Sequence, residues 1–251
     1  MNARKVSGTF LALLAAYAGW VEPRRLVVRP WTLALPRWPA ALAGLRVGVM
    51  TDLHAGVLHA GENAIGRWVD RMNAEAPDLV LLGGDFTDAH PLWGRRLAPE
   101  RIAERLAALE APLGTVAVLG NHDWRTFGMR MWTALAASGI PVLENDAIAL
   151  EAPGGRLHVA GLADVRFRRP DLARALEGVP DDEPVIVLAH DPDVFPFVPS
   201  RHGERFARGH VVEHGRQLVI SSGLGTSGLP VRLFAPPELL VLELRPAAAA
   251  A

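Results

Sequence analysis

Several short apolar segments of this sequence end in residue types that commonly bind metal ions. In chain order these residues are Asp52 and His54, Asp85, Asn121 and His122, and His190. Each motif is weak by itself, because Gly84-Asp85 and Gly120-Asn121 also suit tight turns, in which Gly and Asn adopt left-handed conformations. Independent turns would rarely all carry metal-binding residue types after successive strands. Carboxylate, imidazole and amide groups together favour Mn²⁺, Fe or Zn²⁺, whereas an all-oxygen site favours Mg²⁺ or Ca²⁺.

The segments that would position these residues alternate between apolar runs and amphipathic stretches. Residues 45–50, 79–82 and 115–119 are apolar runs, and the first three groups of candidate ligands follow them. Amphipathic helical spacing lies between the runs and again at 129–137. This alternation predicts a mainly parallel sheet that is covered on both faces. Ligands of such sheets lie beyond the carboxyl ends of the strands, so the candidate residues are expected at one edge of an α/β fold.

The second half of the chain favours β structure. Residues 147–151 and 156–160 flank Pro153-Gly154-Gly155, which predicts a hairpin. The other expected strands occupy 184–189, which ends in His190, 217–221 and 239–244.

The composition describes a folded globular domain and excludes several kinds of chemistry. Of the 251 residues, 50% are hydrophobic and 21% are charged, so the chain can bury a core of ordinary size. Lys and Arg number 26 against 27 Asp and Glu, and the net charge of −1 does not favour sequence-independent nucleic-acid binding. The absence of cysteine excludes disulfides, thiolate zinc sites and cysteine nucleophiles.

The N-terminal residues differ in kind from the rest of the chain. Arg4-Lys5 precedes residues 6–21, an uncharged, mostly apolar stretch that is intermediate in length between a signal-peptide core and a spanning helix. Ala16-Tyr17-Ala18 offers a small-x-small cleavage site, whereas Trp20 and the following Arg24-Arg25 suit the interfacial end of a retained anchor. An ordinary buried helix is the remaining alternative. Export, or membrane association through residues 6–21, is therefore expected.

These patterns divide the chain into four parts. Residues 1–21 are interpreted as the signal peptide or membrane anchor. Four prolines within residues 22–44 exclude a continuous helix, which predicts an extended linker. The main domain is expected over residues 45–246, and residues 247–251 form an alanine tail to which we assign no role.

The ordered motifs resemble those of the calcineurin-like metallophosphoesterases. The residues that stand in that family's order are Asp52-Leu53-His54, Gly84-Asp85, Gly120-Asn121-His122-Asp123 and His190. Small membrane-associated or exported bacterial members are more similar still, because residues 224–232 and 236–239 resemble their terminal segment. The resemblance implies a four-layer α-β-β-α sandwich, formed by a single domain after the N-terminal hydrophobic segment. It also implies a location in the bacterial cell envelope.

The resemblance further implies a ligand set for two divalent metal ions. Asp52 and His54 would hold the first ion, and Asn121 and His190 would hold the second. Asp85 would bridge the two ions. Such a pair of ions suits in-line hydrolysis of phosphate esters.

Two neighbouring residues receive catalytic roles from the same resemblance. The family residue equivalent to His122 faces the substrate, so His122 would stabilise charge or protonate the leaving oxygen. Asp123 would orient His122, as carboxylates often do for functional imidazoles. The implied activity is hydrolysis of phosphodiester or pyrophosphate-type bonds in a small phosphorylated or lipid-linked substrate.

The end of the family's pattern is missing. The family closes its site with Gly-His-x-His, whose histidines bind both metals, and this sequence contains no such motif. Only 26 residues separate His190 from Gln217, which predicts that a strand and the ligand loop have been deleted. A helix over 209–214 would place His210 and His214 on one face as substitute ligands, but the glycines and valines there favour a hairpin. The deletion would remove one imidazole from each metal and expose a sheet edge.

Three functional hypotheses follow from these observations. The leading hypothesis is a metal-dependent phosphoesterase, a hydrolase that works near a membrane surface. The second is a degenerate, non-catalytic member that keeps the scaffold but binds metal poorly. The third is a nuclease, which the balanced charge and the lack of a basic stripe weaken.

Overall fold

The computed structural model describes residues 3–88, 94–192, 194, 209–213 and 216–248. Its strands are β1 (Val27–Leu35), β2 (Leu45–Met50), β3 (Leu79–Leu82), β4 (Thr115–Ala117), β5 (Asp146–Ala152), β6 (Gly155–Gly161), β7 (Val185–Leu188), β8 (Gly209–Glu213), β9 (Arg216–Ile220) and β10 (Glu238–Pro246). Its α-helices are α1 (Ala3–Ala16), α2 (Glu62–Asn73), α3 (Pro99–Leu106), α4 (Asn121–Thr126), α5 (Met129–Ala137) and α6 (Leu172–Ala175). Short 3-10 turns cover Glu22–Arg24 and Ala40–Leu42, and a π-helical turn covers Tyr17–Val21.

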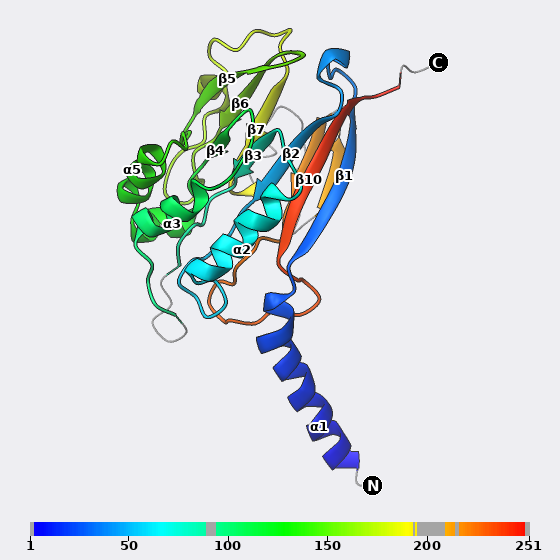
Figure 1. Cartoon of the computed structure of the whole chain (residues 1–251), viewed down its shortest axis with the longest axis vertical. Helices are drawn as coiled ribbons and strands as arrows, with labels where there is room; N and C mark the ends of the chain where they lie inside the picture. Colours follow the sequence, from blue (N-terminus) through cyan, green and yellow to red (C-terminus); the bar gives the residue numbers. More distant parts are fainter. Residues whose placement is uncertain (1–2, 89–93, 193, 195–208, 214–215, 249–251) are drawn as a thin grey trace.

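The larger sheet has the strand order β1-β10-β2-β3-β4 and carries α2, α3 and α5 on one face (Figure 1). All pairs are parallel except β10 with β2, as the alternating sequence pattern predicts. In β3 alternate residues serve two cores: Val80 and Leu82 pack toward α2, α3 and α5, whereas Leu79 and Leu81 face the second sheet. A strand that is buried on both faces needs the continuous apolar run seen in the sequence.

The second sheet has the order β5-β6-β7 and packs against the first through a shared apolar core. The hairpin expected around Gly154 is present as β5 and β6, with Ala152 paired to Gly155. The short helix α6 packs on the outer face of this sheet through Leu172 and Ala175. The four-layer α/β sandwich is therefore confirmed, although α6 supplies the outermost layer among the described residues.

The proline-rich segment 22–44 is not the linker that its composition predicts. Residues 27–35 form β1, which pairs in parallel with β10 from Val27 opposite Glu238 to Leu35 opposite Pro246. Pro30 is tolerated because β1 lies at the edge of the sheet, where a missing N–H costs no ladder hydrogen bond. The folded domain therefore begins before residue 45. Proline excluded a helix correctly, but local composition does not show that an extended segment has a partner strand.

The N-terminal helix α1 extends away from the sandwich (Figure 1). None of the helices that the described residues form has both the length and the apolar character that a membrane crossing requires.

The predicted hairpin before the strand at Gln217 is present as β8 and β9, which pair in antiparallel fashion. Most of the segment where a strand was expected to be deleted, 195–208, lies outside the described residues.

Candidate metal centre

The candidate ligands of the first half come together because their strands are parallel neighbours. Asp52 follows β2, Asp85 follows β3, and His122 lies in the first turn of α4 after β4. The backbone N–H of Asp52 donates to the carbonyl of Gly84 at 3.0 Å, which joins the two strand ends. Asp52, His54 and Asp85 all have positive φ angles, 52°, 45° and 53°. Non-glycine residues in this conformation are strained, and such strain is concentrated at functional sites.

The second sheet delivers His190 to the same place. The Nδ1 of His190 lies 2.8 Å from the carbonyl oxygen of Gly83, so Nδ1 carries the hydrogen and donates it. The other nitrogen, Nε2, lies 3.5 Å from Oδ1 of Asp85. A backbone carbonyl that fixes the tautomer in this way leaves Nε2 as a free electron-pair donor, as is usual for metal-binding histidines. His190 is therefore oriented so that its Nε2 could bind a metal ion.

Two groups of side chains share the carboxylate of Asp85. His54, Asp85 and His122 form one group, and Asp52, Asp85 and His190 form the other. The potential ligand atoms within each group lie within 4.8 Å of one another. Metal–ligand bonds of about 2.0–2.2 Å separate the ligands of one ion by about 3–4.4 Å. The group of Asp52, Asp85 and His190 therefore fits one divalent ion after small side-chain adjustments, and the group of His54, Asp85 and His122 does so only when a ring nitrogen of His122 is free of hydrogen.

This grouping differs in part from the one that the family resemblance implies. Asp52 groups with His190, although its Oδ1 also lies 3.6 Å from Nε2 of His54. His122, expected to face only the substrate, groups with His54 through ring centroids 4.8 Å apart. Asn121 is partly buried and begins α4 beside the cluster. The structure thus brings the predicted residues together around Asp85, with Asp52 and His122 in different partnerships.

Two glycines leave the space that this centre requires. A Cβ atom on Gly120 would collide with Oδ1 of Asp85 and lie 2.8 Å from Cε1 of His190. A Cβ on Gly223 would lie 2.5 Å from Cβ of Asp52, and Gly223 has a φ of +73°. The Gly in Gly120-Asn121 therefore serves close packing around the ligands and not only the turn.

Asp88 is a site residue that the sequence interpretation missed. Its buried carboxylate lies between two rings, with Oδ2 at 3.5 Å from Nδ1 of His54 and Oδ1 at 3.2 Å from Nδ1 of His122. It follows Asp85 by three residues in Gly-Asp-Phe-Thr-Asp, so a second carboxylate soon after the strand end was the available signal. Carboxylates in this position orient the imidazoles and raise their basicity.

Asp123 does not have the orienting role predicted for it. Its carboxylate is completely buried and accepts backbone hydrogen bonds from Gly120 at 3.0 Å and Thr87 at 3.1 Å. It therefore caps the start of α4 and ties that turn to the loop after β3. Burial, together with the charge of Asp85, raises the pKa of Asp123 to about 7. The carboxylate beside Nδ1 of His122 is Asp88, not Asp123.

Nδ1 of His122 is approached both by a donor, the guanidinium of Arg125, and by an acceptor, the carboxylate of Asp88. Nη2 of Arg125 lies 2.8 Å from Nδ1 of His122, and a guanidinium can only donate. With Nδ1 as acceptor, the proton of the neutral ring is on Nε2, which lies 3.2 Å from Oγ of Ser227. Asp88 stabilises the charged ring, in which Nε2 also carries a proton. In both states a proton at Nε2 faces Ser227, a residue from the C-terminal segment that motif reasoning did not single out by itself.

The electrostatics couple metal binding to protons. Burial raises the pKa of Asp85 at the centre of the cluster. Burial works against charge on His190, but the carboxylates of Asp85 and Asp52 outweigh it and raise the pKa of His190. His54 behaves in the same way: burial opposes its charge, but the carboxylates of Asp52, Asp85 and Asp88 together raise its pKa. Protons therefore compete with metal ions for these rings.

His210, one of the two histidines proposed as substitutes for the missing Gly-His-x-His, has its contacts away from this cluster. Nε2 of His210 lies 2.8 Å from Oε1 of Gln217, and its ring packs 6.0 Å from Trp31 on β1. His202 and His214 lie outside the described residues. The predicted hairpin is therefore confirmed by the pairing of β8 with β9, and His210 makes its contacts with Gln217 and Trp31.

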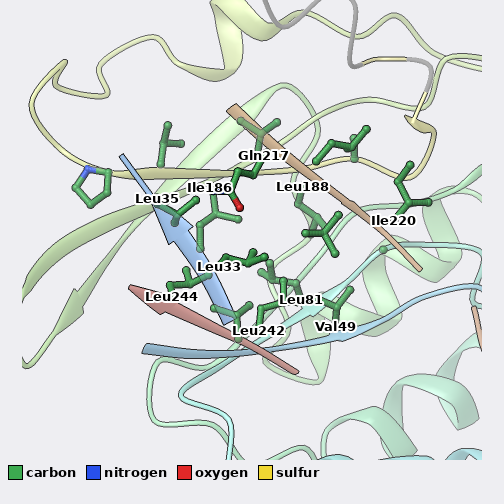
Figure 2. A pocket seen from close by; sticks show the side chains of 18 of the residues that line it. Leu33, Leu35, Val49, Leu81, Ile186, Leu188, Gln217, Ile220, Leu242 and Leu244 are labelled. Carbon is green, nitrogen blue, oxygen red and sulfur yellow. The ribbon is translucent and has the colours of Figure 1, made fainter. Parts of the chain in front are cut away.

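An apolar cavity of about 680 Å³ opens beside the centre (Figure 2). Its walls are the facing side chains of both sheets and of β9, such as Leu81, Leu188 and Ile220. Asp52 and His190 are among the residues that line it. The cavity lies between β7 and β9, in the part of the chain where the sequence predicts the loss of a strand.

Comparison with known proteins agrees with this geometry. A family model described as calcineurin-like phosphoesterase matches residues 45–223, which is more than half of the chain. The chain therefore belongs to the calcineurin-like phosphoesterase family.

Several relatives share this assignment. The chain is 24% identical to the uncharacterized metallophosphoesterase YkuE of Bacillus subtilis, over 91% of this chain and 89% of the relative. It is 26% identical to an uncharacterized metallophosphoesterase of Aquifex aeolicus, over 94% and 98% of the two chains. It is also 31% identical to the transmembrane protein with metallophosphoesterase domain of Danio rerio, over 72% of this chain and 43% of that one.

Solved structures give weaker similarity. The NAD nucleotidase of Haemophilus influenzae matches 61% of this chain and 40% of its own length, with a TM-score of 0.41 and 16% identity. An archaeal phosphodiesterase matches 57% of this chain and 83% of its own length, with a TM-score of 0.32 and 16% identity. Scores below 0.5 carry no weight here, and the family assignment rests on the sequence match and the candidate ligands.

Proposed function

We propose that this protein is a hydrolase that uses two divalent metal ions, Mn²⁺, Fe or Zn²⁺, to cleave phosphodiester or pyrophosphate-type bonds. The observation that carries the proposal is the pair of Asp and His groups that share Asp85. Bound divalent ions supply positive charge for the phosphoryl oxygens and lower the pKa of an attacking water. The mixture of imidazole and carboxylate donors suits these metals.

The protein's own residues supply the remaining chemistry. His122 holds a proton on Nε2, beside Ser227 at the edge of the cluster, where it can reach a leaving oxygen. Asp88 holds the ring of His122 and supports its charged form. Gly83 holds the tautomer of His190 through its carbonyl oxygen. These contacts therefore hold the imidazoles of His122 and His190 in place beside the shared carboxylate of Asp85.

A degenerate, non-catalytic member of the family is the second candidate. The absence of Gly-His-x-His from the sequence favours it, because each ion then lacks one imidazole. Loss of outer partners alone costs about 10–100-fold in metal affinity or activity, and loss of a direct ligand costs more. With Nε2 of His122 protonated, the described groups offer Asp52, Asp85 and His190 to one ion and only His54 and Asp85 to the other.

Metal content and turnover distinguish these candidates. The full-length protein is loaded with Mn²⁺, desalted and measured for bound metal, and hydrolysis of bis(4-nitrophenyl) phosphate is followed in parallel. We expect close to two equivalents of metal and turnover that Asp85→Asn abolishes. One equivalent or none, without turnover, would establish the degenerate alternative.

We also propose that the substrate is a small phosphorylated or lipid-linked ester in the bacterial cell envelope. Membrane association through residues 6–21 would bring the domain to such a substrate. The apolar character of this stretch supports the proposal, as do the arginines that follow it. Separation of membrane and soluble fractions, with and without residues 6–21, tests the location.

A further inference from the structure

A group of exposed apolar side chains surrounds the point where α1 joins the domain. We call this group the apolar foot. Its members and their exposed fractions are Trp20 61%, Leu58 52%, Leu229 64%, Val231 48%, Leu233 41% and Phe234 77%. Large apolar side chains are rarely exposed together on a soluble surface, and such clusters mark interaction sites.

Contacts between distant segments make the foot one continuous surface. The N–H of Arg232 donates to the carbonyl of Ala18 at 2.9 Å, and the N–H of Phe234 donates to Oε2 of Glu22 at 2.9 Å. Nε2 of His59 lies 2.8 Å from the carbonyl oxygen of Gly19. The loop 229–234 and the turn at Leu58 therefore flank the base of α1, as the orange loop beside the blue helix shows (Figure 1).

The helix above the foot exposes apolar residues on more than one side. Phe10, Leu11 and Leu13 are 66%, 65% and 66% exposed, and they point in different directions around the helix axis. A helix that is apolar all round needs an apolar environment. At its base, the guanidinium of Arg24 lies 3.4 Å from the ring centroid of Trp20, and Arg25 donates to the hydroxyl of Tyr17 at 2.9 Å.

These features suit the surface of a lipid bilayer. Trp, Tyr and Arg are enriched where an apolar segment meets the headgroup layer, and arginines there attract anionic lipids. The foot and α1 thus have the chemistry of a segment that enters one leaflet while the domain stays outside.

The foot is connected directly to the metal centre. Ser227, which contacts His122, lies two residues before Leu229. The N–H of Gly225 donates to the carbonyl of Asp52 at 2.6 Å. The guanidinium of Arg232 donates to four carbonyl groups of the same segment, those of Ser222, Gly223, Gly225 and Ala235, and so holds its shape.

We propose that the loop 229–234 is a second membrane-contacting element that docks the domain on the bilayer beside α1. Docking there holds the metal centre next to the headgroup layer. If the proposed phosphoesterase activity holds, the substrate class is then a lipid whose phosphoester headgroup enters from the bilayer surface. The docking itself does not depend on that activity.

The absence of cysteine allows a direct test with single labels in the full-length protein. Leu229→Cys and Phe234→Cys are labelled with an environment-sensitive nitrobenzoxadiazole dye and mixed with vesicles of phosphatidylcholine and phosphatidylglycerol. Leu13→Cys reports on α1, and the control is Glu151→Cys on β5, a strand that lies at the opposite end of the domain from α1 (Figure 1). We expect blue-shifted emission and quenching by nitroxide lipids at 13, 229 and 234, but not at 151.

Other outcomes would overturn the proposal. If only position 13 is quenched, α1 tethers the domain and the loop stays in water. If no position is quenched, the foot has no affinity for lipid. If the emission at 229 shifts with protein concentration without vesicles, a second copy of the chain covers the foot.

A paired activity measurement separates this proposal from the proposed function. Leu229→Glu combined with Phe234→Glu should reduce hydrolysis of a vesicle-borne phospholipid by about tenfold or more, and leave hydrolysis of bis(4-nitrophenyl) phosphate unchanged. Met129→Glu, an exposed apolar position on α5, is the matched control. If the loop labels are quenched but neither substrate is hydrolysed, the proposed phosphoesterase activity is refuted and the membrane docking is supported. If bis(4-nitrophenyl) phosphate is hydrolysed but the loop labels are not quenched, the activity is supported and the docking is refuted.

Discussion

Replacement of Asp85 by Asn tests whether one carboxylate organises both halves of the metal centre. Its oxygens lie 3.8 Å, 4.0 Å and 3.5 Å from Nε2 of His54, His122 and His190. The amide keeps the volume and can still accept the backbone hydrogen bond that Oδ1 receives from His122 at 2.8 Å. Asn also tolerates the positive φ of this position. The change therefore removes mainly the charge shared by the two groups.

The expected loss can be stated as a change in metal-dependent stability. At a Mn²⁺ concentration of 100 Kd, binding stabilises the wild-type protein by about 2.7 kcal/mol per site. A decrease in affinity of about 100-fold, the upper range for outer partners, leaves about 0.4 kcal/mol at the same concentration. For a chain of this size the difference corresponds to about 5–9 °C in Tm. Because burial raises the pKa of Asp85, its charge does not favour the metal-free fold, so the metal-free Tm should change little.

The assay is thermal unfolding of both proteins with EDTA and with Mn²⁺, together with metal analysis after desalting. Asp70→Asn, on the exposed face of α2, is the control for loss of one carboxylate. An Asp85→Asn protein that keeps two equivalents of metal and the full Mn²⁺-dependent shift would refute the shared-ligand arrangement.

Three further predictions concern the same centre. Gly120→Ala should destabilise the fold by about 1–3 kcal/mol in urea unfolding and abolish the Mn²⁺-dependent shift, because its Cβ collides with Asp85. Asp88→Asn should lower kcat by about 10–100-fold. It should also move the alkaline limb of the kcat–pH profile to lower pH, because the charge of Asp88 opposes the fall in the pKa of His122 that burial causes. Mn²⁺ affinity should weaken as pH falls, by up to about tenfold per pH unit for each proton displaced, because the pKa of His190 is raised; calorimetry from pH 6 to 8 measures this.

Each of these predictions has a control or a contradicting result. Gly61→Ala has no atom within 4 Å of its Cβ and should leave metal binding intact. If Asp88→Asn lowers kcat but leaves the alkaline limb of the kcat–pH profile in place, Asp88 supports the folded structure and does not control the pKa of His122. Mn²⁺ affinity that is constant between pH 6 and 8 would show that protons do not compete for the imidazoles.

Much of the scaffold was predictable because its signals are local. Apolar runs such as 79–82 are buried on both faces, so their identity as central strands is visible in the sequence. Parallel strands end at a common edge, which is why Asp52 and Asp85 could be expected together. The hairpins around Gly154 and at residues 209–220 follow from the placement of glycine and β-branched residues.

The predictions of a linker over residues 22–44 and of an orienting role for Asp123 were wrong. In the first case the partner strand is distant in the sequence, and in the second two nearby carboxylates look alike in the sequence. The pairing of β1 with β10 joins residues about two hundred positions apart, so composition alone suggested a linker. Asp88 and Asp123 are both carboxylates near a predicted ligand. Only the direction of each side chain shows that Asp88 faces the imidazoles and that Asp123 binds backbone amides.

The sequence by itself determined the family, the order of the ligands and the α/β plan, because these depend on residue types and short-range periodicity. The tertiary structure decided how the ligands are grouped around Asp85, because two sheets must pack before His190 can reach the first strand ends. It also brought Ser227 against His122 and the loop 229–234 against the base of α1. Those contacts join residues that are more than one hundred positions apart in the sequence, so no local pattern specifies them.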